Sequence, residues 1–426
     1  MTKSNDGDDI TLSNTEKDDV MVITLNTQQA YAKDDFIDWY NHPDKRKRNW
    51  YEISGPAGSG KTTIVRHIID ELGFSDNEVA FVAYTGKAAL ALRLSGVPGR
   101  TVHSMVYELT VVNAREDGNL VYVNGRPKTK MVFTKKDKLD PDLRLLVVDE
   151  GGMVETTMAQ DLLSFGIPLL VLGDLHQLPP VFGNGIFLSK PDVVLTMVMR
   201  QAEDSPILYI AKSAIYHMAI QYGVYGNNDE VLVIRKDKVF NSHELIKRLI
   251  YMSDMIICGT NNLRDMLNKY IRLNIQGIDS NTVTLDDKLI CRQNHWDIML
   301  GGEYDDIALV NGIVGYCTGI NKNPKNRSSY MEIDFRPEFS VSRQFIDLPI
   351  DHKYLFANYE KRKQMAGIKT DNILFEFGSV ITCHLAQGSQ ADTVLVFVEN
   401  WSDSDYFWKW LYTAVTRAKK KLILVM

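Results

Sequence analysis

The chain has 426 residues, of which 45% are hydrophobic and 24% are charged, and its formal net charge at pH 7 is −6. This length and composition are typical of a globular protein with two or more packed cores. The negative net charge argues against a surface coated with basic residues, so any nucleic acid would be bound by local positive potential, backbone amides and base stacking.

The sequence also bears on location and redox state. No apolar run approaches the roughly 20 residues needed to span a bilayer, and the polar N-terminus lacks the apolar core of a signal peptide. We therefore expect a cytoplasmic protein without a membrane partner. Its cysteines, Cys258, Cys291, Cys317 and Cys383, match neither metal-ligand nor disulfide spacing, which predicts reduced thiols in the core.

The first part of the chain predicts a tail followed by a phosphate-binding loop. Residues 1–20 are rich in acidic and small polar residues, so we expect a disordered acidic tail. Further on, Trp50–Ile53 is a strand-like run, and the spacing of Ile64, Ile68 and Ile69 predicts a helix. Between these elements the chain reads Gly-Pro-Ala-Gly-Ser-Gly-Lys-Thr, which is a full P-loop.

A P-loop holds phosphate mainly with its backbone. Its glycines let successive N–H groups curl around the anion, and the following helix points its positive end at it. The ammonium of Lys61 should reach the β- and γ-phosphates of ATP, and the Thr62 hydroxyl should bind Mg²⁺. The predicted nucleotide-binding residues of the loop are Gly55, Pro56, Ala57, Gly58, Ser59, Gly60, Lys61, Thr62 and Thr63.

Short apolar runs recur after the P-loop and alternate with stretches of helical periodicity. The clearest strands are Val79–Ala83, Leu145–Val148 and Leu169–Leu172. Short buried strands separated by helices predict an α/β fold with a parallel sheet that has helices on both faces.

Two stretches interrupt this rhythm with alternating apolar and polar residues. The first, about residues 107–140, contains the turn signal Asn124-Gly125 and predicts a β-hairpin insertion. Its basic residues fit either a pin that meets a duplex junction or an ordinary solvated ribbon. The second, about residues 319–370, predicts a small β-rich subdomain.

Acidic and amide side chains follow two of the predicted strands. Asp149 and Glu150 come directly after Leu145–Val148, so they should project from the carboxyl end of a buried strand beside the P-loop. We expect Asp149 to hold Mg²⁺ and Glu150 to orient and deprotonate the attacking water. Gln177 follows the next strand, and its amide can both donate and accept hydrogen bonds, which suits a sensor of the γ-phosphate.

The order of these motifs resembles superfamily 1 helicases, specifically the RecD-like superfamily 1B branch that includes phage Dda-type enzymes. The resemblance covers nearly the whole chain. The further segments that carry it are Leu25-Asn26 with Gln29 and Ala32 (Q motif), Tyr84–Ala89 (motif Ia), Thr101–Ser104 (motif Ib), Gly173–Pro180 (motif III), Leu195–Gln201, Gly378–Gln390 (motif V) and Leu411–Ala418 (motif VI).

The resemblance implies two RecA-like P-loop domains with parallel sheets. Residues 21–190 would form the first motor domain and residues 191–426 the second, each with one of the β-rich insertions. It assigns Gln29 to adenine, Gly388 to the nucleotide, and Arg200 and Arg417 to the γ-phosphate. A guanidinium that crosses a cleft reaches the phosphate only when the cleft is closed, which would couple hydrolysis to domain position. Read alone, either arginine also fits a solvated surface residue.

The resemblance also implies a path for single-stranded DNA, lined by Thr85, Lys87, His103, Thr382 and His384. Read alone, each of these fits an ordinary loop residue. A polar set on a predicted helix fits either a nucleic-acid contact or a solvated helix face; its members are Asn261, Asn262, Arg264, Asn268 and Arg272. The aromatic residues between 401 and 412 fit core packing better than base stacking.

The sequence departs from the family pattern at three places. Gly151-Gly152 replaces a small residue plus serine after Glu150, Leu385 stands where a lysine is common, and Gln390 stands where a glutamate is common. The residues expected to hydrolyse the nucleotide are intact, so we expect an active enzyme.

These observations lead to an ATP-dependent, Mg²⁺-dependent DNA helicase, acting as a monomer on single-stranded DNA and on junctions of single and double strands. The resemblance alone implies 5′-to-3′ travel. The compact chain without a eukaryotic targeting segment is compatible with a phage or bacterial role in replication, repair or recombination, with proteins of these processes as candidate partners. Two alternatives stay open. One is a DNA-stimulated ATPase that loads or remodels other proteins without unwinding by itself, and the other is an RNA-directed motor. Strand separation by the purified protein, and stimulation by DNA compared with RNA, would distinguish them.

Overall fold

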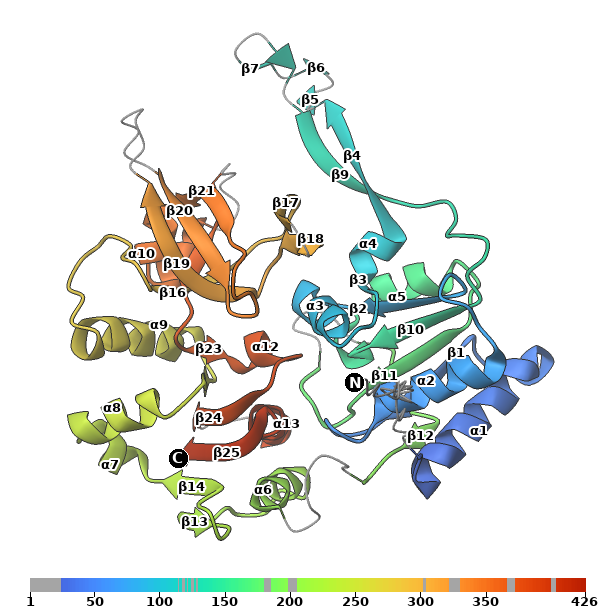
Figure 1. The fold of residues 1–426 in the computed structure, drawn as a ribbon, viewed down its shortest axis with the longest axis horizontal. Helices are drawn as coiled ribbons and strands as arrows, with labels where there is room; N and C mark the ends of the chain where they lie inside the picture. Colours follow the sequence, from blue (N-terminus) through green and yellow to red (C-terminus); the bar gives the residue numbers. More distant parts are fainter. Residues whose placement is uncertain are drawn as a thin grey trace, which may run out of the picture.

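The computed structural model describes residues 24–426 apart from several short gaps. The gaps are residues 114, 117–118, 121, 124–125, 128, 180–184, 198–204, 302–303, 322–329, 366–371 and 400–403. The expected tail at residues 1–20, the turn at Asn124-Gly125 and Arg200 therefore lie outside the described residues. Two α/β halves stand side by side, and antiparallel strands project from both (Figure 1).

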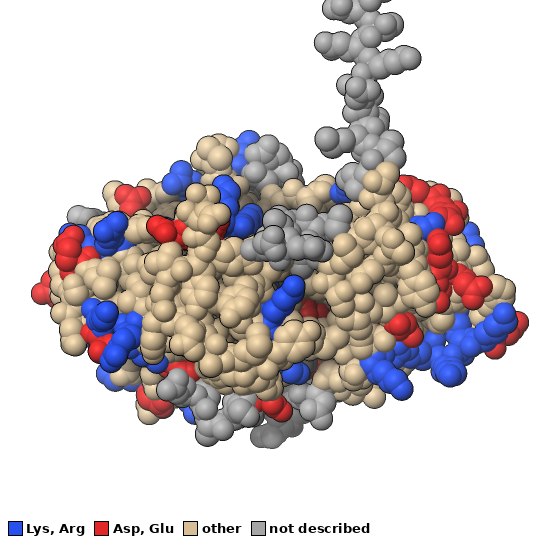
Figure 2. All heavy atoms as spheres, turned by 90° about the horizontal axis from the view of Figure 1, so that it is seen from below, with Lys and Arg blue, Asp and Glu red and all other residues tan. Residues whose placement is uncertain are grey.

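On the face of the molecule seen from below, charge is mixed rather than gathered into one basic area (Figure 2). Lysine and arginine side chains alternate there with acidic and uncharged ones. This face agrees with the expectation from the net charge of −6. Among the described helices, none combines the length and the apolar character needed to cross a lipid bilayer.

The first sheet has six strands in the order β12-β1-β11-β10-β2-β3, and its pairings are parallel. In chain order the strands are β1 (Trp50–Ser54), β2 (Val79–Ala83), β3 (Gly99–Thr101), β10 (Leu145–Asp149), β11 (Leu169–Gly173) and β12 (Val193–Val194). The three strands expected after the P-loop are thereby confirmed. In register, Ser54 pairs with Gly173 and Asp149 with Ala83, so the carboxyl ends of the central strands meet at one edge of the sheet.

Helices cover both faces of this sheet, as the apolar runs predict. They are α1 (Thr27–Asn41), α2 (Lys61–Leu72), α3 (Gly86–Leu94), α4 (Val102–Val106) and α5 (Thr156–Leu163). Side chains of a strand alternate between its two faces. Leu145 and Val147 accordingly pack with α1 and α2, whereas Leu146 and Val148 pack with α4 and α5.

A long hairpin leaves α4 and extends away from the first sheet (Figure 1). Its main strands, β4 (Tyr107–Asn113) and β9 (Thr129–Lys135), pair antiparallel in continuous register. Two shorter pairs follow toward its far end, formed by β5 (Arg115–Glu116) with β6 (Asn119–Leu120) and β7 (Tyr122–Val123) with β8 (Arg126–Pro127). The predicted β-hairpin insertion is confirmed.

The second sheet also has six strands, in the order β13-β14-β25-β24-β15-β23, and is parallel except at its edge strand β13. The strands are β13 (Gly223–Tyr225), β14 (Val231–Ile234), β15 (Met255–Cys258), β23 (Ile381–Thr382), β24 (Ala391–Phe397) and β25 (Ala418–Val425). Its helices are α6 (Pro206–Ile215), α7 (Lys236–Phe240), α8 (His243–Tyr251), α9 (Asn261–Tyr270), α12 (Cys383–Ala386) and α13 (Ser404–Val415).

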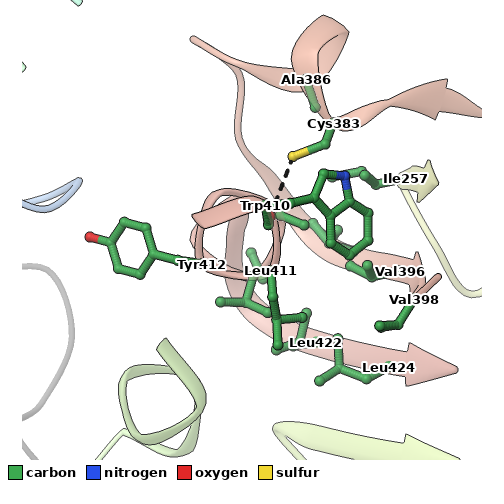
Figure 3. Close-up of a cluster of buried hydrophobic side chains, with 14 of the residues drawn as sticks. Ile257, Cys383, Ala386, Val396, Val398, Trp410, Leu411, Tyr412, Leu422 and Leu424 are labelled. Carbon is green, nitrogen blue, oxygen red and sulfur yellow. Dashed lines mark hydrogen bonds between the residues drawn. The ribbon is translucent and has the colours of Figure 1, made fainter. Parts of the chain in front are cut away.

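The core of this half forms around α13. Trp410 and Leu411 pack against Val396, Leu422 and Leu424 of the sheet (Figure 3). Core packing by the described aromatic residues of this helix is therefore confirmed, because Tyr406, Phe407 and Trp408 also pack against the cluster. The expectation of reduced, buried cysteines is confirmed as well, since the four thiols are buried and free.

An antiparallel sheet of five strands, in the order β21-β20-β19-β16-β22, stands on the second half (Figure 1). Its strands are β16 (Lys288–Cys291), β19 (Val314–Asn321), β20 (Tyr330–Pro337), β21 (Phe345–Asp351) and β22 (Phe375–Phe377), with β17 (His295–Gly301), β18 (Tyr304–Leu309), α10 (His352–Phe356) and α11 (Tyr359–Met365) attached. The α/β fold with two parallel sheets and small antiparallel insertions agrees with the prediction. From the strand pairing, we propose domain limits near residue 197, after β12, and residues 288–377 for the second insertion.

Candidate nucleotide site and nucleic-acid interface

The P-loop connects β1 to α2 and turns tightly at two glycines. Gly58 and Gly60 have φ angles of 84° and 81°, in the left-handed region that disfavours residues with a Cβ. A Cβ at Gly60 would also lie 2.3 Å from Nε2 of Gln29. The loop therefore stays close to the amino end of α2, where backbone N–H groups and the helix dipole favour an anion.

Lys61 begins α2 and folds back over the loop. Its Nζ donates to the carbonyl oxygens of Gly55 at 2.6 Å and of Pro56 at 3.1 Å. Thr62 and Thr63 follow in the first turn of the helix. The ammonium group thus lies within the curve of the loop, where the phosphates of a nucleotide would be held.

Gln29 lies directly behind the P-loop and is buried. Its Nε2 donates to the carbonyl oxygen of Ser59 at 2.9 Å, and its Oε1 accepts from the Asn26 N–H at 2.9 Å. Each amide atom can form one more hydrogen bond. Adenine recognition by Gln29 stays a prediction, and it would use these remaining positions.

Asp149 ends β10, and Glu150 follows with a φ of 52°, which is uncommon for a residue with a side chain. Burial raises the pKa of Asp149, and the charge of Lys61 opposes that rise. Burial and the adjacent Asp149 raise the pKa of Glu150. A carboxylate whose pKa is raised accepts a proton more readily, which fits the role expected for Glu150.

Packing accounts for the first of the two glycines after Glu150 but not for the second, which stands where a serine is common, because a Cβ at Gly152 would lie 3.5 Å from Cδ1 of Leu188, an ordinary contact distance. A Cβ at Gly151 would lie 2.3 Å from Cγ1 of Val171 on β11, so the turn after Glu150 has no space for a larger residue. The glycine is therefore required by the close approach of the turn to the neighbouring strand.

Gln177 lies in the segment after β11, with 9% of its surface exposed. Its Nε2 donates to Oδ2 of Asp174 at 3.4 Å, and the same oxygen accepts from the Tyr412 hydroxyl at 2.7 Å. Our sequence analysis missed Asp174 and Tyr412 as site residues. A signal existed for Asp174, because it follows an apolar strand in the same way as Asp149 does.

Arg417 comes from the second half, just after α13, and is 2% exposed. Its Nε donates to the Thr413 carbonyl at 2.9 Å, its Nη1 to the Ser389 carbonyl at 3.3 Å, and its Nη2 to Oγ1 of Thr416 at 3.1 Å. Its charge opposes the rise in the pKa of Glu150 that burial and Asp149 cause. Arg417 therefore lies close to Glu150 of the first half and is not a solvated surface residue.

A cavity of about 1100 Å³ lies beside the P-loop and between the two halves. Gly55, Pro56 and Ala57 line it from the first half, and residues of α6 and β25 line it from the second. Pockets of several hundred Å³ suit ligands of nucleotide size, so the cavity has room for ATP.

The residues present fit Mg²⁺. Thr62 and Asp149 offer a hydroxyl and a carboxylate, and Mg²⁺ prefers such hard oxygen ligands. In the described ranges, no group of three or more His, Cys, Asp or Glu side chains is arranged to hold a metal ion. This suits a Mg²⁺ that is held partly by nucleotide phosphates, because protein sites for this ion commonly supply only one or two carboxylates.

The residues expected to line DNA lie on two short helices that face each other. On α3, Thr85 caps the helix through Oγ1, which accepts from the Ala88 N–H at 3.1 Å. Nζ of Lys87 donates to the carbonyl oxygen of Leu385 on α12 at 3.4 Å. On α12, Thr382 precedes the helix and His384 lies within it. The structure thus brings four of the five expected residues to one contact between the halves.

Gly388, which the resemblance assigns to the nucleotide, lies at the same contact, whereas His103, the fifth expected DNA residue, lies elsewhere. A Cβ at Gly388 would lie 3.5 Å from Cβ of Ala88, so Gly388 belongs to this contact between α3 and α12. His103 lies at the base of the hairpin, with ring centroids of Tyr107 at 5.8 Å and of Phe133 at 6.3 Å. Burial lowers the pKa of His103, and its direct role in DNA binding stays a prediction.

Three polar residues of the helix after β15 have structural roles. Arg264, Asn268 and Arg272 are buried. Arg264 forms an ion pair with Glu376 at 2.7 Å, and Arg272 forms one with Asp287 at 3.0 Å. The Asn268 amide donates a hydrogen bond to the Val380 carbonyl at 2.9 Å. The expectation of a nucleic-acid contact or a solvated helix face is therefore wrong for these three. Their partners lie far along the chain, which the local spacing could not reveal.

Comparison with known proteins agrees with this geometry. Two family models match, an AAA domain over residues 40–224 and a UvrD-like helicase C-terminal domain over residues 377–425. The ATP-dependent RecD2 DNA helicase of Deinococcus radiodurans is 30% identical over 179 residues, which cover 40% of this chain and 22% of that protein. The ATP-dependent DNA helicase dda of Enterobacteria phage T4 is 26% identical over 262 residues, which cover 56% of this chain and 55% of that protein. The chain is thus similar, over part of its length, to two proteins named as ATP-dependent DNA helicases.

The solved structures of this group show the same fold at low identity. A Pif1 helicase studied for DNA unwinding at forked dsDNA aligns over 95% of this chain and 92% of its own, with 16% identity and a TM-score of 0.51. The Pif1 helicase from Bacteroides in complex with ADP-AlF3 and ssDNA aligns over 94% of this chain and 92% of its own chain. The identity is 16% and the TM-score is 0.50. The likeness shows two RecA-like halves with antiparallel insertions. The chain matches only 22% and 55% of the lengths of its relatives RecD2 and dda.

Proposed function

We propose that this chain is an ATP-dependent DNA helicase that moves along single-stranded DNA and separates the strands of a duplex. The observation that carries the proposal is the meeting of charged residues from both halves at one cleft. Lys61 acts on the pKa of Asp149 and Glu150, and Arg417 acts on that of Glu150 from the other sheet. A site completed by the second half can respond to movement between the halves.

ATP hydrolysis would use these groups in defined roles. Lys61 would exchange the carbonyl oxygens of the loop for the β- and γ-phosphate oxygens. Thr62 and Asp149 would hold Mg²⁺, which neutralises charge on the phosphates when it is bound. Glu150 would take the proton of the attacking water, and Arg417 would stabilise negative charge on the transferred phosphoryl group.

Movement on DNA would follow from the contact between α3 and α12. Lys87 from the first half and His384 from the second lie on these facing helices. Closing and opening of the nucleotide cleft would change their separation, so two grips on one strand could alternate. The hairpin β4–β9 is our candidate for the strand-separating pin, because it extends from α4 beside His103.

The finer assignments rest on relatives. RecD2 and dda are named as ATP-dependent DNA helicases, and the Pif1 structures contain ssDNA or concern forked dsDNA. We propose 5′-to-3′ travel, a monomeric core and a role in replication, repair or recombination on the same resemblance.

Strand separation by the purified protein tests the proposal. With ATP and Mg²⁺, the chain should open a DNA duplex that carries a single-stranded tail. Lys61→Ala should lower ATP turnover by about 100-fold or more, because removal of one preorganised group that stabilises phosphoryl charge has effects of this order. Lys45→Ala, an exposed lysine away from the cleft, serves as the matched control and should behave like the wild type.

Other results of the same assay would reject the proposal. DNA-stimulated hydrolysis without strand separation would indicate the accessory ATPase. Stimulation by RNA but not by DNA would indicate an RNA-directed motor.

A further inference from the structure

The antiparallel insertion of the second half packs directly on α3 of the first half. Leu90 of α3 is buried in the same hydrophobic cluster as Val310, which belongs to the turn between β18 and β19. The approach is close, because a Cβ at Gly86 would lie 2.3 Å from Cγ2 of Val310. A Cβ at Gly312, in the same turn, would lie 3.8 Å from Cδ of Lys87. The insertion therefore stands beside the helix that carries Lys87 (Figure 1).

A basic and aromatic row crosses the sheet of the insertion. In register, Lys288 of β16 lies opposite Tyr316 of β19, and Tyr316 lies opposite Arg336 of β20. Residues that lie opposite each other on neighbouring strands project from the same face. Leu289 and Phe335, their neighbours along two of the strands, are buried in the core of the insertion. The three side chains of the row are partly exposed, so they lie on the other face of the sheet.

One carboxylate is paired with this row. Glu338 follows β20, and its Oε1 lies 2.6 Å from Nζ of Lys288 and accepts from the Tyr316 hydroxyl at 3.4 Å. The Glu338 side chain is 43% exposed and that of Lys288 is 19% exposed, so solvent reaches both partners. Exposed ion pairs contribute little stability, and phosphate is an anionic acceptor like a carboxylate. A phosphate oxygen can therefore replace Glu338 on Lys288.

The charges around this ion pair extend to Lys87. Burial lowers the pKa of Lys87, and the cations Lys288 and Arg417 lower it further, whereas the carboxylate of Glu338 opposes them. Cations thus outnumber carboxylates among the charges that act here, although the whole chain has a net charge of −6. Lys87 is itself partly exposed. Such a local excess of positive charge attracts the phosphates of nucleic acid.

We propose that the antiparallel insertion is part of the nucleic-acid interface and that Glu338 is a built-in competitor of DNA. Lys288 binds a backbone phosphate of single-stranded DNA next to the phosphate bound by Lys87. In the absence of DNA, Glu338 pairs with Lys288, and binding exchanges this carboxylate for the phosphate. The inference rests on the proposed function and extends it, because it adds a third grip to those on α3 and α12.

The salt dependence of DNA binding tests the contact of Lys288. A labelled oligothymidylate is titrated with the full chain at several salt concentrations, without nucleotide. Each phosphate contact to single-stranded DNA contributes about 0.7 to the slope of log Kd against log salt concentration. Lys288→Gln should raise Kd several-fold and lower this slope by about 0.7, a change that general damage to the site would not produce. A wild-type slope in Lys288→Gln would overturn the contact.

Glu338→Gln tests the competition. The substitution releases Lys288, so it should lower Kd by up to about fivefold, the size expected from one exposed ion pair, and leave the slope unchanged. In the Lys288→Gln background it should change Kd by less than about twofold, because no lysine is left to release. A Kd at or above the wild-type value in Glu338→Gln would overturn the competition, and so would an equal effect in both backgrounds.

Asp237→Asn is the matched control, because it removes the same charge from another exposed ion pair of the second half. Asp237 lies on α7, away from the insertion, and pairs with Arg235 at 2.9 Å (Figure 1). Exposed charges more than about 10 Å apart are largely screened at 0.1 M salt, so Kd and slope should stay at the wild-type values. A decrease of Kd equal to that in Glu338→Gln would show a general effect of net charge and overturn the competition.

The same titrations separate this inference from the proposed function. A wild type without measurable affinity for single-stranded DNA would reject the proposed function. A wild type that binds DNA, with Lys288→Gln and Glu338→Gln indistinguishable from it, would reject the inference alone.

Discussion

At the scale of single residues, Lys87 shows how burial between the halves prepares a cation for a charged ligand. Burial lowers the pKa of Lys87 to about 8, and the nearby Lys288 and Arg417 add to the effect while Glu338 opposes it. The residue before it is packed equally closely, because a Cβ at Gly86 would lie 2.3 Å from Cγ2 of Val310. A phosphate placed here would restore the stability of the charged form.

A pH titration of DNA binding tests the role of Lys87. A bound phosphate raises the pKa of Lys87 above its value of about 8 in the free protein. The affinity for single-stranded DNA should therefore be full below pH 8 and decline above it, by up to about tenfold per pH unit. Lys87→Arg should remove this decline, since arginine stays charged. The measurement is the Kd of a labelled oligothymidylate at constant ionic strength, and a flat wild-type profile would contradict the assignment.

Single residues also show where sequence reasoning stops. The P-loop, Asp149 and Glu150 could be predicted because each acts within a short local pattern. The bond between Tyr412 and Asp174 could not, because it joins positions 238 residues apart. The same holds for Arg264, whose partner Glu376 lies on another element.

At the scale of elements, a buried ionic cluster joins α9 to the antiparallel insertion. Glu376 on β22 lies near the guanidinium groups of Arg264, Arg292 and Arg362, at 2.7, 3.2 and 3.6 Å. Burial raises the pKa of Glu376, but the three arginines outweigh it and lower the pKa below its usual value. Arg264 and Arg362 also pair with Asp265, so removal of the Glu376 charge would leave three arginines with one acidic partner among these pairs. The insertion is therefore held to the second sheet by a buried ionic network in which Glu376 is the central carboxylate.

Glu376→Gln should destabilise the second half. Removal of one partner from a buried ionic cluster costs about 3–5 kcal/mol. The pKa of Glu376 is lowered in the folded state, so its stabilising contribution is present above its unfolded pKa and is lost as the pH falls through its folded pKa. Thermal unfolding at pH 7 should show a clearly lower midpoint.

The matched control is Glu338→Gln. Glu338 pairs with Lys288 at 2.6 Å, but the Glu338 side chain is 43% exposed. The substitution should therefore lower the free energy of unfolding by less than about 1 kcal/mol. Small and equal shifts of the thermal unfolding midpoint in Glu376→Gln and Glu338→Gln would contradict the structural role of the cluster.

Helices and strands could be predicted where their burial produces a local run or alternation of apolar residues in the sequence. The apolar runs of β2, β10 and β11 could be read directly, and so could the alternation of the hairpin β4–β9. The extent of the second insertion could not, because β16 and β22 join it through long-range pairing, with Leu289 opposite Phe377. Local alternation does not encode such pairing.

At the scale of the whole molecule, the described contacts between the two halves include those at the segment after β11 and those at the facing helices α3 and α12. Tyr412 and Thr413 hold the segment after β11, and Lys87 meets α12. Basic residues are mixed with acidic ones on the face shown in Figure 2, so this face offers nucleic acid a few local contacts rather than a uniformly basic surface. The order of the two halves could be predicted from the motifs, but these contacts required the fold.

The central claim is that the two halves form a motor that moves in one direction on DNA. The most direct measurement compares two duplexes of equal sequence, one with a 5′ single-stranded tail and one with a 3′ tail, in the presence of ATP and Mg²⁺. We predict that the wild type opens only the 5′-tailed duplex and that Lys61→Ala opens neither. Opening of the 3′-tailed duplex alone would contradict the direction, and wild-type protein that opens neither duplex would contradict the motor itself.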